Sequence, residues 1–258
     1  MILKLGHSMN QISGYLELND RIYKISSYKD IQAFLLKLDK STCAISEEEL
    51  DKLCSLTIEK WQIDDCNVEY GGSPLVLHQL TWWRIYNYRI KEGTVAIQND
   101  AFYTRTRNGG PNICSLNSIY MPNTIKIVGR SAFYALSTLS HIKFSDNLIK
   151  ICDRAFCECK LLNKINLPES LKIIESYAFQ ATGIEEIEIP SSVIRIGSGA
   201  FSYCEKLKII IFNGQPQEIG SDILNGCNSL ERIEIPVGSI DYFVDRFYPL
   251  DKDLFVEK

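Results

Sequence analysis

The stretch LNKINLPESLKIIESYAFQATGIEEIEIP, residues 162–190, contains one complete unit of a pattern that recurs along the C-terminal two-thirds of this 258-residue chain. Phe179 marks the unit, and its counterparts, which together with it we call the ladder, are Phe102, Phe133, Phe156, Phe201 and Leu224. Successive spacings are 31, 23, 23, 22 and 23 residues. A fixed period in the twenties predicts a solenoid, because each unit can bury its apolar face only against its neighbours.

Within the unit, the residue pattern predicts a short strand, a turn and a buried aromatic side chain. Residues 162–167 end in an alternation of apolar and polar side chains, which is typical of a half-buried strand. Pro168 ends this strand because it has no backbone N–H to continue the hydrogen-bond ladder. Leu171 and Ile174 then point inward, and Phe179 fills the space between neighbouring coils.

Stacked coils of this kind form an α/β-type repeat solenoid, with a parallel sheet on one side and an irregular, partly helical convex side. At a strand spacing of ~4.8 Å, seven coils give a slab roughly 30 Å long. The phenylalanines of the ladder are expected to form its core. We therefore interpret these aromatic residues as structural rather than ligand-binding.

The segment INLPESLKIIESYAFQATGIEEIEIPSSVIRIGSGAFSYCEKL, residues 165–207, resembles the short bacterial leucine-rich repeats called BspA-like. The resemblance extends over about residues 85–258, and the ending at 233–258 is similar to the C-terminal cap of that family. It implies a leucine-rich-repeat fold. It also implies the binding of proteins or glycans, because most members are surface or secreted proteins with that role.

The residues at about 239–258 predict a capping helix independently of any family. Ser239 is a good N-cap, and Tyr242, Phe243 and Phe247 lie on neighbouring helical positions. An amphipathic helix at this place would cover the last coil and block edge-to-edge pairing with another chain.

Residues 1–84 show no 23-residue period and are predicted to form a small α+β accessory or capping domain, followed by the solenoid at 85–258. Residues 15–25 are typical of a β-hairpin with a turn at Asn19 and Asp20. Apolar spacing and capping signals predict helices at about 31–38 and 46–54. Trp82 and Trp83 are expected to seal the open end of the solenoid, with a binding role as the alternative.

Composition and charge describe an ordinary soluble globular protein, with 45% hydrophobic residues and a net charge of −4. This mild acidity gives no general attraction for nucleic acid or for anionic membranes. No secretory signal is visible at the N-terminus, and no window reaches the roughly 20 apolar residues needed to insert into a membrane. We expect a cytoplasmic protein, with a secreted or cell-surface location as the alternative.

The sequence has no phosphate-binding glycine loop, nucleophile elbow, paired CxxC or HExxH motif, which predicts a non-enzymatic protein without a cofactor. Nine cysteines without a visible export signal favour reduced thiols. Cys159, Cys204 and Cys227 each follow a ladder residue by three positions and are expected to be small buried side chains. Cys152 and Cys157 lie near Cys159, but the paired spacing of zinc sites is missing, so no metal is predicted.

Candidate binding residues are the side chains on the open face of the predicted sheet. In each strand the third and fifth positions project outward, because alternate residues point to opposite faces. These positions hold Ser118, Tyr120, His141, Lys143, Lys164, Asn166, Glu186, Glu188, Ile209, Ile211, Arg232 and Glu234. Along the solenoid they run from basic through acidic and apolar to mixed.

Two features of this surface favour a binding role. An exposed pair of isoleucines bounded by charges, as at Ile209 and Ile211, is typical of a small binding patch. Cover by the C-terminal segment, or simple β-propensity, is the alternative. The second feature is the insertion at 104–111, where Arg105 and Arg107 precede Gly-Gly-Pro and would suit an acidic partner or a phosphate. A tolerated surface loop is the alternative there.

The sequence therefore favours a protein–protein interaction module that presents the strand face to a protein partner. Glycan or cell-surface adhesion is the alternative that the family resemblance implies. A ligand-binding or enzymatic role for residues 1–84 is a second alternative. The identity of the partner and the oligomeric state are left open.

Overall fold

The computed structural model describes residues 2–8, 11–18, 21–25, 61–63, 68–71, 75–80, 86–103, 115–247 and 250–258. Before residue 86 it describes the course and the pairing of strands alone. Four predictions lie outside the described residues and stay predictions. They concern the two helices at about 31–38 and 46–54, the pair Trp82 and Trp83, and the loop that holds Arg105 and Arg107.

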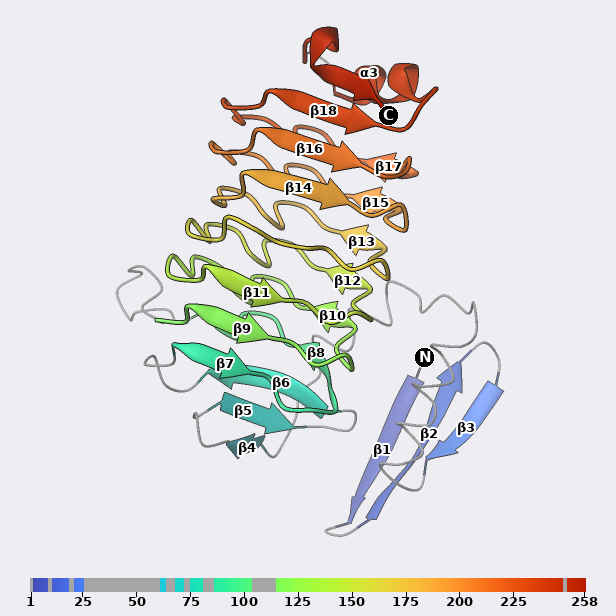
Figure 1. The fold of residues 1–258 in the computed structure, drawn as a ribbon. Helices are drawn as coiled ribbons and strands as arrows, with labels where there is room; N and C mark the ends of the chain where they lie inside the picture. The colour runs from blue at the N-terminus through green and yellow to red at the C-terminus, as the bar shows by residue number, and fades with distance from the viewer. Residues whose placement is uncertain are drawn as a thin grey trace.

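The repeats form a stack of coils, and all but one of the described coils have a strand on the same side of the molecule (Figure 1). These strands lie side by side and parallel, in two separate sheets. The first sheet contains β7 (Asn87–Arg89), β9 (Ser118–Tyr120) and β11 (His141–Lys143). The second contains β14 (Glu186–Ile189), β16 (Ile209–Phe212), β18 (Arg232–Ile235) and β19 (Phe255–Glu257). The predicted leucine-rich-repeat solenoid is confirmed, and we call this side the front face.

The opposite side is formed by a further sheet, which we call the back sheet, whose strands in the repeats are short and parallel; it is not the partly helical surface that the sequence predicted. It contains β8 (Thr94–Ile97), β10 (Ile127–Val128), β12 (Lys150–Ile151), β13 (Ile173–Ile174), β15 (Arg195–Ile196) and β17 (Glu218–Ile219). Most of these strands are two residues long and contain a β-branched isoleucine, which favours extended backbone. The prediction of partly helical structure on this side was wrong for the described coils.

The ladder forms the centre of the core, as predicted. Phe102, Phe133, Phe156 and Phe179 have no exposed surface, and each ring stacks on the next with centroids 4.8, 5.0 and 5.4 Å apart. Phe201 continues the stack at 5.5 Å from Phe179. The interior of the solenoid is thus one continuous column of aromatic rings.

The predicted burial of the cysteines that follow the ladder is confirmed, and each thiol also donates a hydrogen bond. The Sγ atoms of Cys159, Cys204 and Cys227 lie 3.1 Å from the carbonyl oxygen of a ladder phenylalanine in the preceding coil. Thr182 occupies the same repeat position and donates its hydroxyl to the Phe179 carbonyl at 2.9 Å. The thiols of Cys159, Cys204 and Cys227 thus link neighbouring coils, whereas the Thr182 hydroxyl bonds within its own coil.

Each coil bends through left-handed residues on both sides of its ladder position. Two residues before the ladder, φ is 51° at Ser131, 52° at Arg154 and 57° at Tyr177. Two residues after it, φ is 56° at Ala135 and 63° at Glu158. These residues have side chains, so each of these conformations carries a steric cost of about 1–2 kcal/mol that the stacked neighbours must offset.

The strand predicted at residues 162–167 does not form, and we call the coil at residues 162–168 the seam. In Figure 1 it passes between β11 and β14 without a strand arrow. Among the described residues, its only backbone hydrogen bond to a neighbouring front strand runs from Glu185 N to Asn163 O, at 3.3 Å. Ile142 in β11 and Leu167 within the seam are only partly buried, although Ile187 and Ile189 at the corresponding positions of β14 are buried. The front face is therefore interrupted at the seam.

The C-terminal cap contains a shorter helix than predicted. Helix α3 (Ile240–Arg246) is followed by a 3-10 turn, η1 (Lys252–Leu254), and then by β19. Phe243 and Phe247 pack on Phe212, so the predicted apolar face does cover the last coil. Ser239 stands at the N-cap, but its hydroxyl donates to the Pro236 carbonyl instead of capping the helix. The edge of β18 pairs with β19, so a strand as well as the helix covers the last coil.

The predicted hairpin at residues 15–25 is confirmed. Strands β1 (Ile2–Ser8), β2 (Gln11–Leu18) and β3 (Arg21–Ile25) form an antiparallel sheet in which Leu18 pairs with Arg21. Further along, β4 (Trp61–Ile63), β5 (Val68–Gly71) and β6 (Leu75–Leu80) extend the back sheet, because β6 pairs in parallel with β8. The boundary at residues 84 and 85 stays a prediction.

Candidate binding face

The outward side chains of the front face form two columns that run along the solenoid. In the first, Ser118 pairs in register with His141, and Glu186 with Ile209 and Arg232. The whole first column is Asn87, Ser118, His141, Lys164, Glu186, Ile209 and Arg232. The second column is Arg89, Tyr120, Lys143, Asn166, Glu188, Ile211, Glu234 and Val256. Lys164 and Asn166 belong by repeat position, since the seam has no strand pairing.

Of the twelve predicted outward residues, eight are exposed, two are half-buried and two are buried. His141, Lys143, Lys164, Asn166, Glu186, Glu188 and Arg232 are exposed, and Tyr120 is 39% exposed. Ser118 is buried and donates its hydroxyl to Asn87 Oδ1 at 2.6 Å. Glu234 is also buried, because the side chains of Arg232 and Lys258 cover it. The expectation that Ser118 and Glu234 are exposed was therefore wrong.

The half of the front face before the seam is basic. The guanidinium of Arg89 lies over the Tyr120 ring, 5.1 Å from its centroid, which is a cation–π contact. Lys143 and Lys164 follow along the solenoid, and the His141 Nδ1 atom lies 2.8 Å from the Ser140 hydroxyl. Arg89 was missed in the sequence because the first coil has the irregular 31-residue spacing. The buried Tyr88, in register with Ile119, is the signal that could have placed it.

The half after the seam is acidic and then apolar. Glu186 is exposed, and Glu188 accepts a hydrogen bond from Asn213 Nδ2 at 2.6 Å. Ile209 and Ile211 come next and are half-buried, between the fully buried Ile210 and Phe212. The predicted isoleucine pair is therefore present as a partly exposed apolar step bounded by charged residues.

Beyond the isoleucines, the last rows are neutralised within the protein. Arg232 Nε lies 2.7 Å from Glu234 Oε1, and Lys258 contacts the other carboxylate oxygen. Lys258 and then Arg232 hold the pKa of the Glu234 carboxyl below its usual range. Val256, in register with Glu234, is 42% exposed and adds apolar surface to the front face. This contribution was not expected, because Val256 lies in the segment that was predicted to form the cap helix. Among the described residues of the front face, the exposed charges that form no ion pair thus lie between β7 and β14.

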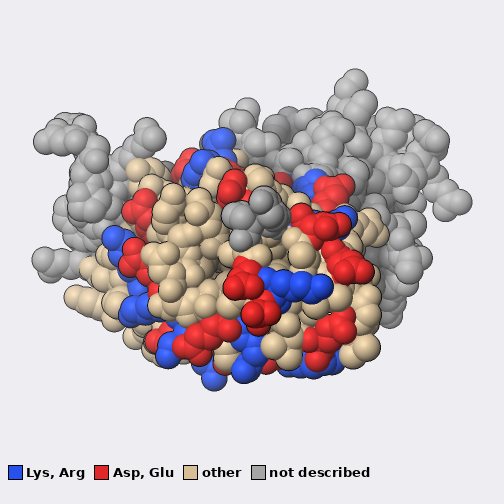
Figure 2. All heavy atoms as spheres, turned by 90° about the horizontal axis from the view of Figure 1, so that it is seen from above, with Lys and Arg blue, Asp and Glu red and all other residues tan. Residues whose placement is uncertain are grey.

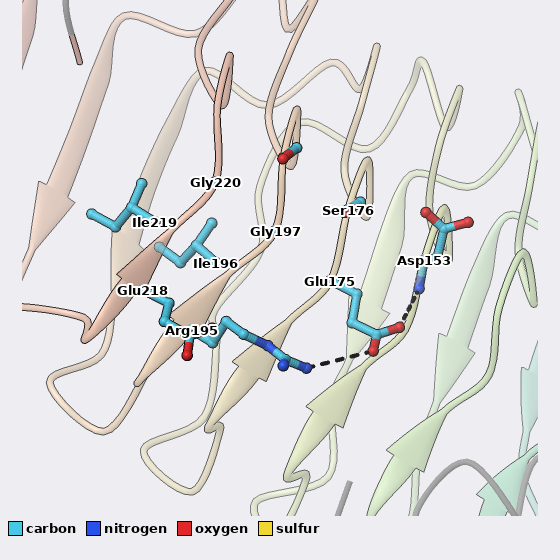
Figure 3. A pocket seen from close by; sticks show the side chains of 10 residues that line it. Asp153, Glu175, Ser176, Arg195, Ile196, Gly197, Glu218, Ile219 and Gly220 are labelled. Carbon is cyan, nitrogen blue, oxygen red and sulfur yellow. Dashed lines mark hydrogen bonds and ion pairs between the residues drawn. The ribbon is translucent and has the colours of Figure 1, made fainter. Parts of the chain in front are cut away.

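A polar notch of about 530 Å³ lies on the back sheet, across β13, β15 and β17. Its floor is bare backbone at Gly197 and Gly220 (Figure 3). A Cβ atom at either glycine would lie 2.3 Å from a backbone nitrogen of the preceding coil, so no side chain fits there. Asp153, Glu175, Arg195 and Glu218 supply the charged groups of its walls.

The central carboxylate of this notch is already engaged inside the protein. One oxygen of Glu175 lies 2.7 Å from Nζ of the fully buried Lys150 and 3.8 Å from Arg195 Nη2. The other accepts the backbone N–H of Asp153 at 3.0 Å. These contacts join three successive coils. The arrangement suits a structural tie better than a ligand site.

The described residues offer little for catalysis or metal binding. No three His, Cys, Asp or Glu side chains among them come together as a possible metal site. Burial raises the pKa of the Cys157 and Cys227 thiols to about 12 and also raises that of Cys204. Such thiols are weak nucleophiles at neutral pH, because the thiolate is the reactive form.

Charge and helix length give two further constraints. Seen from the C-terminal end, acidic and basic side chains are interspersed over the described surface (Figure 2). The mixed charge of this face differs from the basic patch that is typical of nucleic-acid-binding proteins. Within the part of the chain that the structure describes, no helix is long and apolar enough to span a bilayer.

The comparisons with known proteins agree with this architecture. The family described as "BspA type Leucine rich repeat region (6 copies)" matches residues 111–231 and 172–249. None of the curated proteins matches the chain.

Two solved structures share the fold. A leucine-rich repeat protein from Bacteroides ovatus is 24% identical with a TM-score of 0.54, over 70% of this chain and 47% of its own. The T. pallidum leucine-rich repeat protein is 22% identical with a TM-score of 0.56, over 72% and 95%. This chain thus spans about half the length of the Bacteroides ovatus protein, and the likeness concerns the fold alone.

Proposed function

The chain belongs to the BspA-type leucine-rich-repeat family, and on that premise we propose that it is a non-enzymatic protein-interaction module whose front face contacts a protein partner. The observation that carries the proposal is the apolar step at Ile209 and Ile211, which is half-buried, with the exposed carboxylates of β14 on one side and the Arg232–Glu234 ion pair on the other. An apolar centre with a charged rim is the usual anatomy of a protein interface.

Glycan binding is the less favoured function for this face. Sugars commonly stack on exposed aromatic rings, and Tyr120 is the one aromatic side chain in the two columns. The Arg89 guanidinium already lies over the Tyr120 ring. A protein partner instead uses the isoleucine pair and the surrounding charges together.

The proposal is tested with two matched variants, Ile211→Glu on the front face and Ile194→Glu on the back. Ile194 is 42% exposed and lies outside the two columns, so it controls for the chemical change itself. Both variants should keep the wild-type circular dichroism spectrum. In affinity capture from native lysate, we expect a protein bound by wild type and by Ile194→Glu to be lost with Ile211→Glu. Equal capture by both variants would contradict the proposal.

A further inference from the structure

The charge of the front face reverses where its strand pairing is interrupted. Before the seam, the exposed charges are Arg89 and Lys143, and the seam itself carries Lys164. Directly after it come Glu186 and Glu188. Because the columns run straight along the stack, a ligand that follows them meets basic, then acidic, then apolar side chains. This order is not symmetric, so it distinguishes ligands that have the same composition.

The dimensions of the surface suit a narrow ligand. From β7 to β16 there are five steps between neighbouring coils, or about 24 Å at ~4.8 Å a step. The two columns are two residues apart along each strand, or roughly 7 Å. An extended chain covers ~3.3 Å per residue, so about seven or eight residues would reach from the basic half to the isoleucines.

We propose that the front face binds one extended segment of its protein partner, which lies across the strands with acidic, basic and apolar side chains in that order. The acidic residues face Arg89, Lys143 and Lys164. The basic residues face Glu186 and Glu188, and the apolar residues contact Ile209 and Ile211. This assignment rests on the proposed function and names the chemistry of the partner.

The columns fit a segment better than a second copy of this chain. A strip about 30 Å long and about 13 Å wide offers on the order of 400 Å². A stable complex of two folded surfaces needs about 800 Å² on each partner. An extended segment can make full use of a narrow strip because it brings no bulky neighbouring surface.

Two synthetic 12-residue peptides of identical composition test the order. One carries three glutamates, then two lysines, then two leucines, with Gly-Ser spacers; the other carries the lysines first, then the glutamates, then the leucines. Reversing the direction of the second peptide does not reproduce the order of the first. At low salt, we expect the wild-type protein to bind the first peptide at least about tenfold more tightly. The difference should shrink at 1 M salt, where the screening length falls to about 3 Å.

The matched protein variant exchanges the charges of the two halves, with Lys143→Glu and Lys164→Glu combined with Glu186→Lys and Glu188→Lys. Its net charge is unchanged, and all four residues are exposed, so the fold should be retained. We expect this variant to prefer the second peptide. Fluorescence anisotropy of labelled peptides measures both affinities.

Three results would overturn the assignment. They are equal affinity of wild type for the two peptides, an unchanged preference in the exchanged variant, and no binding of either peptide. A dimer of the protein alone that the exchange dissociates would instead identify a second copy as the occupant. If Ile211→Glu abolishes capture while the peptides are not distinguished, the interaction module stands and the extended segment does not.

Discussion

The ladder and the front face cross the seam differently. Inside the solenoid, Phe156, Phe179 and Phe201 remain stacked, with centroids 5.4 and 5.5 Å apart. The rings before the seam are closer, at 4.8 and 5.0 Å. On the surface of the same coils, strand pairing stops after β11 and resumes at β14. The interior is continuous where the front face is not.

This contrast shows that the front strands can lose their pairing while the rest of each coil stays packed on its neighbours. Aromatic pairs are favourable over centroid distances of about 4.5–7 Å, so an extra half ångström costs them little. Beside the ladder, backbone hydrogen bonds also span the same coils at ordinary length, as from Phe156 N to Ala178 O and from Phe179 N to Ala200 O, both at 2.8 Å. The stacked rings, the backbone hydrogen bonds beside them and the pairing of β12, β13 and β15 therefore hold the two halves of the solenoid together at the seam.

The sharpest contrast is expected in amide hydrogen exchange. Backbone N–H groups at residues 164–167 form no hydrogen bond to a neighbouring coil within the described residues, so they should exchange with opening free energies near zero. The N–H groups of Ile187 and Ile210 should open only on global unfolding, at about 5–15 kcal/mol. Exchange followed by mass spectrometry measures both sets. Strong protection at residues 164–167 would show that the front face is continuous in solution.

Removing a ring at the seam should be the most destabilising substitution. Phe179→Ala leaves a cavity in the fully buried stack, and we expect a loss of about 3–5 kcal/mol in the free energy of unfolding. Phe179→Leu, which copies Leu224 at its own ladder position, should cost less than about 1.5 kcal/mol. Urea denaturation separates the two. A loss below 1 kcal/mol for the alanine variant would mean that the ladder does not hold the seam.

On the back of the same coils, Glu175→Gln tests the tie across three coils. Glutamine keeps an acceptor for the Asp153 N–H but leaves the buried Lys150 ammonium without its carboxylate. We expect a loss of about 2–3 kcal/mol. Glu188→Gln on the front face is the matched control and should change stability by less than about 0.5 kcal/mol. Equal effects of the two changes would show that the tie contributes nothing.

The smallest effect concerns the buried thiols that follow the ladder, and it depends on pH. The pKa of Cys227 is about 12 in the folded protein and about 8.5 in the unfolded chain. The folded state keeps its proton in this range, so the stabilisation is complete below about pH 8.5 and falls as pH rises toward 12. The contribution is about 1.4 kcal/mol per pH unit for each thiol.

Cys227→Ser isolates this contribution. It keeps a donor for the Phe201 carbonyl and removes the ionisable group. In urea denaturation under reducing conditions, the variant should lose less stability than wild type between pH 8.5 and 9.5. Parallel pH dependence of the two proteins would show that this thiol is accessible to solvent when folded.

The interior could be predicted from the sequence and the pairing of the surface strands could not. The period of the ladder identifies Phe133, Phe156 and Phe201 as equivalent, and equivalent apolar residues in a solenoid must share one core. Residues 162–167 have the same alternating pattern as their neighbours, yet they form no strand. Pairing depends on how the strand lies against both neighbouring coils, which no local pattern encodes. The left-handed bends were also missed, because Ser131, Arg154 and similar residues are not the glycines that usually mark such turns.

The candidate site was predictable to a similar extent. The alternation of side chains along a strand depends on backbone geometry alone. It therefore placed Lys143, Glu186 and Ile211 correctly in the outward columns. The covering of Glu234 was not predictable, since Lys258 approaches it only through the unexpected pairing of β19 with β18. Val256 joined the surface for the same reason.

The left-handed bends form the corners of each coil, and they lie at fixed distances along the sequence from the ladder residue of that coil. Duplication or deletion of one 22- or 23-residue unit within a gene would therefore leave the corners of the other units unchanged. The front face would gain or lose one row, about 4.8 Å of length, with its remaining side chains in place. In the proposed binding mode, the number of copies would set how long a segment the face can accept, and point substitutions in the columns would set which segment it is.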